Sequence, residues 1–113
     1  MGGIAKTPPP PYYAVIFTSV RTEGDNGYGK MAAEMVKLGS SQPGFLGAES
    51  VRNEEGMGIT VSYWESPEAI ENWKNHLRHK EAQQLGRELW YDTFATRVCK
   101  VDRHGLFKPP SAE

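Results

Sequence analysis

Apolar and polar residues follow strand-like and helix-like patterns in six successive segments of the chain. Residues 12–20 (YYAVIFTSV) are aromatic and β-branched, which is typical of a strand. Residues 45–52 (FLGAESVR) and 58–64 (GITVSYW) predict a hairpin, because a polar segment with glycine separates two such runs. Residues 89–101 (LWYDTFATRVCKV) predict a fourth strand. Along 58–64, alternation places Trp64 on the opposite face from Tyr63.

Two further segments have apolar residues at helical spacing. The first covers residues 28–38, and Gly39 with the serines behind it predicts its end. The second follows Ser66, a favourable N-cap, and has Pro67 at its first position. Its pattern weakens around residues 76–79 and resumes through Ala82, Leu85 and Leu89.

The resulting order, β-α-β-β-α-β, predicts a ferredoxin-like α+β fold with a four-stranded antiparallel sheet and both helices on one face. In the last strand, alternation places Trp90, Phe94 and Val98 on one side and Tyr91, Ala95 and Cys99 on the other. Both faces of the sheet are therefore partly apolar, and the helices cover only one. We expect a second copy of the chain to cover the other face, which predicts a homodimer.

The length of 113 residues favours a single domain. Its predicted extent is residues 12–103. The proline-rich segment 1–11 and residues 104–113 are expected to be tails outside the core.

Composition and charge exclude several classes of protein. The net charge of −1 gives no field that would attract nucleic acid or an anionic membrane. The apolar runs are too short to span a bilayer, and the N-terminus lacks the apolar core of a signal peptide. A single cysteine, Cys99, excludes an internal disulfide and a multi-thiolate zinc site. We therefore expect a cytoplasmic protein without nucleic-acid or membrane partners.

The candidate chemistry is concentrated in the second helix. Trp73 and His76 are three residues apart, which places them on neighbouring parts of one helix face. Trp73 is either a core anchor or the wall of a ligand pocket, and His76 either a bystander or a proton acceptor or donor at the edge of that pocket. His79 belongs to a basic stretch. His76 and His79 could bind a metal only with a third ligand, and the sequence shows none, so we predict no metal site.

Other polar residues allow two interpretations each. Thr18 and Ser19, near the end of the first strand, either present hydroxyls to a ligand or are ordinary strand residues. Arg97 lies in an apolar run and needs a carboxylate partner, an anionic ligand or access to water. The sequence has no P-loop, dinucleotide or nucleophile-elbow pattern, so redox chemistry must rely on the substrate or on a bound group.

Three stretches resemble the antibiotic biosynthesis monooxygenase (ABM) family of the dimeric α+β barrel superfamily. They are residues 42–53, 58–91 and 96–101. The resemblance implies the fold and the dimer expected above. It also implies one of several functions, because some relatives oxidise aromatic polyketides to quinones with dioxygen alone, some degrade haem, and others only bind small molecules or have no known reaction.

The haem-degrading relatives use an asparagine near the end of the first strand, a tryptophan on the second helix and a later histidine that binds iron. Trp73 matches the tryptophan. The asparagine position falls at Phe17 or Thr18, and the histidine position falls near Gln83. Two of the three residues therefore differ from the haem-degrading pattern.

Together with the residues above, the resemblance implies a cofactor-independent monooxygenase that acts on an aromatic or quinone-like small molecule. His76 is the expected catalytic residue, and the expected substrate-binding residues are Trp73, Trp64, Phe17 and Thr18. A haem-binding, haem-degrading monooxygenase and a non-catalytic dimeric binding or stress-related module are the two alternatives.

Overall fold

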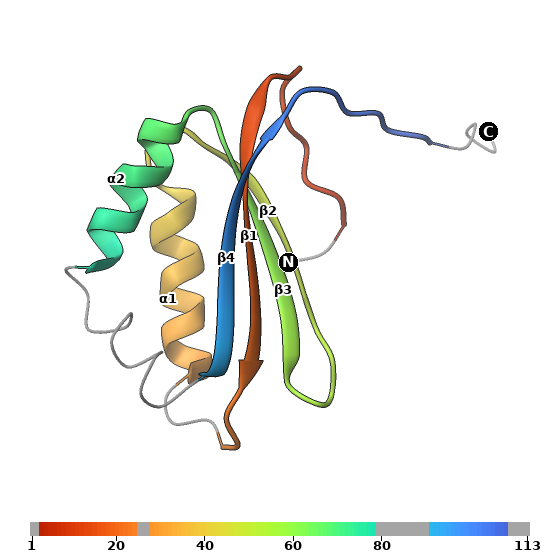
Figure 1. Cartoon of the computed structure of the whole chain (residues 1–113). Helices are drawn as coiled ribbons and strands as arrows, with labels where there is room; N and C mark the ends of the chain where they lie inside the picture. Colours follow the sequence, from red (N-terminus) through yellow and green to blue (C-terminus); the bar gives the residue numbers. More distant parts are fainter. Residues whose placement is uncertain (1–2, 25–27, 79–90, 109–113) are drawn as a thin grey trace.

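The structure is a computed structural model that describes residues 3–24, 28–78 and 91–108. Its elements are β1 (Tyr12–Arg21), α1 (Tyr28–Ser40), β2 (Phe45–Arg52), β3 (Met57–Trp64), α2 (Pro67–Arg78) and β4 (Tyr91–Val101). The strands form one antiparallel sheet in the order β2-β3-β1-β4, and both helices lie on the same face (Figure 1). The predicted ferredoxin-like α+β fold is confirmed.

The connection from β3 into α2 depends on local capping and on one glycine. The backbone N–H of Ala69 donates to the hydroxyl of Ser66 at 3.1 Å, so the predicted N-cap is present. Gly44, before β2, has a φ of +84°, and a Cβ there would lie 2.6 Å from the Cβ of Ala69. Only glycine at position 44 therefore allows the start of α2 to lie so close to the start of β2.

The core lies between α2 and the sheet. Trp64, Ala69 and Ile70 are its buried centre, and Tyr13, Val15, Phe45 and Trp73 pack around them. Because Tyr13 and Val15 face the helices, alternation along β1 places Phe17 and Ser19 on the same face. Trp64 and Tyr63 lie on opposite faces, as their positions in the sequence predicted.

A β-bulge changes one prediction about β4. Val20 pairs with Thr93, but Arg21 pairs with Tyr91, so Asp92 is an extra residue on β4. The bulge turns Tyr91 to the side of Phe94, and their ring centroids are 5.8 Å apart. The prediction that these two aromatic residues lie on opposite faces was therefore wrong, and Trp90 lies outside the described residues.

The N-terminal segment runs beside the sheet face that points away from the helices (Figure 1), and His104, just after β4, also contacts this face. The Tyr12 hydroxyl lies 2.7 Å from Nδ1 of His104 and accepts a hydrogen bond from Thr7. Glu49 accepts hydrogen bonds from the backbone N–H of Ala5 at 2.9 Å and from the Tyr63 hydroxyl at 2.6 Å. Part of this face is thus covered by the chain itself, through segments that sequence analysis had assigned to tails.

Tyr63 remains a hydrogen-bond donor throughout the physiological pH range. Burial, followed by the hydrogen bond and charge of Glu49, raises the pKa of the Tyr63 hydroxyl to about 12. The Tyr63 phenol is therefore protonated across the physiological pH range, and its hydrogen bond to Glu49 is maintained there.

The rest of this face is open. Val51, Met57 and Ile59 are 74%, 47% and 43% exposed. Arg97 is also exposed here, so it has the access to water that a charge in this strand requires. None of the helices in the described residues is long and apolar enough to cross a bilayer.

Candidate functional site

Three rings stack between α2 and β3, and we call them the ring stack (Trp64, Trp73 and His76). The centroids of Trp64 and Trp73 are 6.3 Å apart with an interplanar angle of 25°. Those of Trp73 and His76 are 5.7 Å apart at 18°. Gly39, near the end of α1, lies against the Trp73 ring, because a Cβ there would be 3.4 Å from it, an ordinary van der Waals contact. The predicted proximity of Trp73 and His76 is therefore present in the structure.

His76 has an unusual environment for a polar side chain. The residue is half-buried, and its Nε2 atom is buried without a hydrogen-bond partner among the described residues. A buried polar atom without a partner costs free energy, so native proteins pair nearly all of them. An imidazole nitrogen can accept or donate a proton. A ligand hydroxyl that reached Nε2 would supply the missing partner.

Trp64 differs from Trp73 in its exposure. It is 1% exposed, and its indole N–H donates to the Ser62 hydroxyl at 2.9 Å. Trp73 is half-buried at the edge of the core. The structure thus places Trp64 in the core, as a support for the Trp73 ring, and leaves Trp73 as the indole closer to solvent.

Phe17 lies on the helix-facing side of the sheet in a second group of rings, the aromatic patch (Phe17, Tyr91 and Phe94). Its centroid is 5.4 Å from that of Tyr91 and 5.5 Å from that of Phe94. Thr18 points to the opposite face, where it pairs with Ile59 and Ala95. The structure therefore separates Thr18 from Phe17, and among the described residues the ring contacts of Phe17 are with Tyr91 and Phe94 and not with the ring stack.

Sequence reasoning did not include Tyr91 and Phe94 among the site residues. Strict alternation along β4 would place Tyr91 and Phe94 on opposite faces of the sheet. The bulge at Asp92 brings both rings onto the face of Phe17. A bulge does not change the composition of a strand, so the pattern of apolar residues could not have revealed it.

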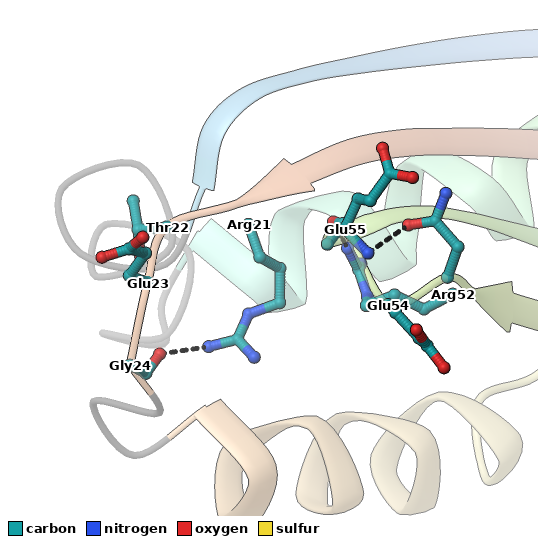
Figure 2. Close-up of a pocket in the computed structure, with 9 residues that line it drawn as sticks. Arg21, Thr22, Glu23, Gly24, Arg52, Glu54 and Glu55 are labelled. Atoms are coloured by element: carbon teal, nitrogen blue, oxygen red, sulfur yellow. Dashed lines mark hydrogen bonds between the residues drawn. The ribbon is translucent and has the colours of Figure 1, made fainter.

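A hollow of about 570 Å³ opens at the end of the sheet where β1 leaves it and the β2–β3 hairpin turns (Figure 2). The side chain of Arg21 donates to the Gly24 carbonyl at 3.0 Å. Asn53 Oδ1 accepts from the backbone N–H groups of Glu55 and Met57, each at 3.0 Å. The lining residues are Arg21, Thr22, Glu23, Gly24, Arg52, Asn53, Glu54, Glu55 and Gly56.

Arg52 reaches from this hollow to the helix-facing side of β1. Its Nη2 donates to the Ser19 hydroxyl at 2.7 Å, and its Nη1 donates to the Gly56 carbonyl. A Cβ at Gly58 would be 2.6 Å from the guanidinium carbon, so the absence of a side chain there is what lets Arg52 cross β3.

No group of three or more potential metal ligands occurs among the described residues. His79 and Gln83, which entered the metal and haem arguments, lie outside the described ranges. Phe17 is described, and it presents an apolar ring where the haem-degrading relatives are expected to have an asparagine.

Comparison with protein families places this geometry in context. The model of the family described as antibiotic biosynthesis monooxygenase matches residues 11–85, which is more than half of the chain. The chain belongs to the ABM family.

A curated relative of this ABM chain is the uncharacterized protein YqjZ of Bacillus subtilis (strain 168). It is 56% identical over 108 residues, which cover 96% of this chain and 95% of YqjZ. Among solved structures, SnoaB, a cofactor-independent oxygenase from Streptomyces nogalater, gives a TM-score of 0.68 at 16% identity, over 88% of this chain and 100% of SnoaB.

Rv0793 from Mycobacterium tuberculosis gives a TM-score of 0.63 at 15% identity, over 90% of this chain and 99% of Rv0793. At identities this low, both solved structures show that the fold is shared. They do not show that this chain shares an activity with either protein.

Proposed function

We propose that this ABM-family protein oxidises an electron-rich phenolic or quinone-like aromatic molecule with dioxygen, without a bound cofactor. The observation that carries this proposal is the His76 ring, stacked on Trp73 with its Nε2 buried and unpaired among the described residues. Trp73, half-buried at the edge of the core, supplies apolar surface beside an aromatic substrate, and His76 supplies a proton acceptor one helical turn away.

The reaction begins with proton transfer from the phenolic hydroxyl to Nε2 of His76. The resulting phenolate is electron-rich and gives one electron to dioxygen, after which the two radicals combine at a ring carbon. One oxygen atom becomes a second carbonyl. The other leaves as water with the hydroxyl hydrogen and the ring hydrogen, so dioxygen is fully reduced by electrons from the substrate alone.

The surroundings favour this chemistry. The aromatic patch adds three rings to the helix-facing side of the sheet, and such rings are suited to contact with an aromatic substrate. SnoaB, whose fold is similar, is described as a cofactor-independent oxygenase, which supports a reaction without a bound group.

Haem degradation is less well supported by the described residues. Phe17 is an apolar residue on the helix-facing side of β1, and Thr18 faces away from the helices. Neither supplies the side-chain amide of the asparagine that the haem-degrading relatives are expected to have at this position. His76 would be the iron ligand in such a protein, so the test below includes haem as a separate condition.

The direct test is oxygen uptake by the purified protein with 1-naphthol after dialysis against a metal chelator. We expect uptake above the protein-free rate and formation of the corresponding naphthoquinone. Absence of uptake across a panel of hydroxylated naphthalenes and anthrones would contradict the proposal. Uptake that required added haem would assign the protein to the haem-degrading branch.

We further propose that two copies pair through the open sheet face, where Val51, Met57 and Ile59 are exposed. Ile59→Glu is expected to convert a dimer to a monomer, because it would bury a carboxylate in an apolar contact. Sedimentation equilibrium measures the mass. Val36→Glu is the control, since Val36 is 55% exposed but lies on α1. A monomeric wild type, or a dimer that persists in Ile59→Glu, would contradict this pairing.

A further inference from the structure

Two charged residues lie in one row across the sheet face that points away from the helices. Glu49 on β2 pairs with Val61 on β3. Val61 in turn pairs with Ile16 on β1, and Ile16 pairs with Arg97 on β4. Residues opposite one another in neighbouring strands share a face. This charged row therefore has a carboxylate on one edge strand, a guanidinium on the other edge strand, and two apolar side chains between them.

Glu49 and Arg97 do not neutralise each other within one chain. Three strand spacings of about 4.8 Å put roughly 14 Å between their backbones, with Val61 and Ile16 in the way. Among the described residues, neither Glu49 nor Arg97 has an ion-pair partner. By the pairing of the strands, the other regularly paired residues that the structure describes on this face are uncharged.

The carboxylate of Glu49 is held in position by two neutral donors. The backbone N–H of Ala5 donates to one of its oxygens, and the Tyr63 hydroxyl donates to the other. Each oxygen of a carboxylate can accept a further hydrogen bond. Glu49 is therefore fixed on the face and can still pair with a cation.

Arg97 needs such a carboxylate once this face is covered. It is exposed in the single chain, and the pairing of two copies proposed above would remove much of its access to water. A guanidinium taken out of water is stabilised only when an opposite charge with good hydrogen-bond geometry replaces the water. Among the regularly paired residues described on this face, Glu49 is the one that supplies an opposite charge.

The direction of the two-fold axis decides which residues of the second copy lie over Arg97. When two copies of a sheet stack with aligned strands, the axis lies between the sheets and runs either along the strands or across them. An axis across the strands places β4 over β4 of the second copy. The regularly paired residues of β4 on this face carry no acidic side chain. An axis along the strands instead keeps each row over the same row and exchanges its two edges.

We infer that two copies of the chain pair about an axis parallel to the strands, so that Arg97 of each copy forms an ion pair with Glu49 of the other. In this arrangement β4 of one copy lies over β2 of the other, and the ion pair occurs twice. Stacked sheets are about 10 Å apart, which leaves room for an arginine and a glutamate side chain to meet. Val51 and Ile59, in the next row of the same face, supply exposed apolar surface beside the ion pairs.

The test is a charge exchange, with the dissociation constant of the dimer measured by sedimentation over a dilution series. Arg97→Glu places two carboxylates together at each site, and we expect the dissociation constant to rise by about 100-fold or more. Glu49→Arg should raise it similarly by placing two guanidinium groups together. The double variant Arg97→Glu with Glu49→Arg restores opposite charges, and its dissociation constant should return to within about 10-fold of the wild type.

The rescue distinguishes an ion pair from a structural effect of Glu49, which also holds Ala5 and Tyr63. A displaced N-terminal segment would not be corrected by a change at Arg97. Glu49→Gln keeps an oxygen acceptor and should also relieve the repulsion in Arg97→Glu. The matched control is Lys74→Glu, which makes the same change of charge at an exposed position of α2 and should leave the dissociation constant unchanged.

This inference rests on the pairing of two copies proposed above, and its failure can be told apart from failure of that pairing. A wild-type dimer whose dissociation constant is unchanged in Arg97→Glu, or double variants as weak as Arg97→Glu alone, would overturn the axis along the strands. The pairing itself would then stand. A monomeric wild type would overturn both. Oxygen uptake with 1-naphthol is measured separately, so these results leave the proposed oxidation untouched.

Discussion

Replacement of Trp64 by alanine is expected to lower the free energy of unfolding by about 3–5 kcal/mol. Trp64 is 1% exposed, lies at the centre of the core, and contacts Phe45 and Trp73 ring to ring. Its removal leaves a cavity and takes away the indole N–H that donates to Ser62. Urea unfolding followed by circular dichroism measures the change.

Trp73→Ala is the comparison for this prediction. Trp73 is only half-buried, so its loss should cost less stability than the loss of Trp64 while weakening the binding of aromatic ligands. A Trp64→Ala protein that unfolds within about 1 kcal/mol of the wild type would show that Trp64 is not the core anchor.

Replacement of His76 by glutamine is expected to lower kcat/KM for a phenolic substrate by about 10²- to 10⁴-fold, the usual contribution of a general base. Glutamine keeps a polar side chain of similar size but cannot take the phenolic proton. His76 makes no hydrogen bond at Nε2 among the described residues, so stability should change little. Initial rates of oxygen uptake, with unfolding curves for the same samples, measure both effects.

His104→Gln is the matched control for His76→Gln. His104 lies on the other side of the sheet and contacts Tyr12 and Thr7. Its replacement should leave the rate unchanged. A His76→Gln enzyme with the wild-type rate would remove His76 from the mechanism, and an equal loss of rate in both variants would indicate a structural effect.

Local patterns in the sequence determined most of the fold. The N-cap at Ser66 and the alternation that separates Trp64 from Tyr63 depend on neighbouring residues, and both are present in the structure. The position of Tyr91 depends on how β4 pairs with β1 around Asp92. Pairing register is a property of two strands, so the sequence of one strand does not specify it.

Part of the candidate site, like most of the fold, could be predicted from local patterns in the sequence. Trp73 and His76 are three residues apart on one helix, and helical geometry alone predicts that their rings are neighbours. The contact between Arg52 and Ser19 joins residues 33 apart in sequence, and it requires both the strand register and the absence of a side chain at Gly58. No local pattern contains that information.

The contacts of the segments near the two ends of the chain also could not be predicted from local sequence patterns. A run of prolines predicts an extended segment, but it does not predict where that segment lies. The contacts of Ala5 with Glu49 and of His104 with Tyr12 come from tertiary packing. They cover part of a face that apolar patterning alone had assigned to a second copy of the chain.

The most direct test of the account is the fate of labelled dioxygen in a reaction of the chelator-treated wild-type protein with 1-naphthol. The account predicts that, under ¹⁸O₂, the quinone formed contains one labelled oxygen atom and that the other appears in water. Rapid quenching and mass spectrometry limit exchange with solvent. Quinone without label, or no quinone at all, would contradict oxidation by dioxygen at the ring stack.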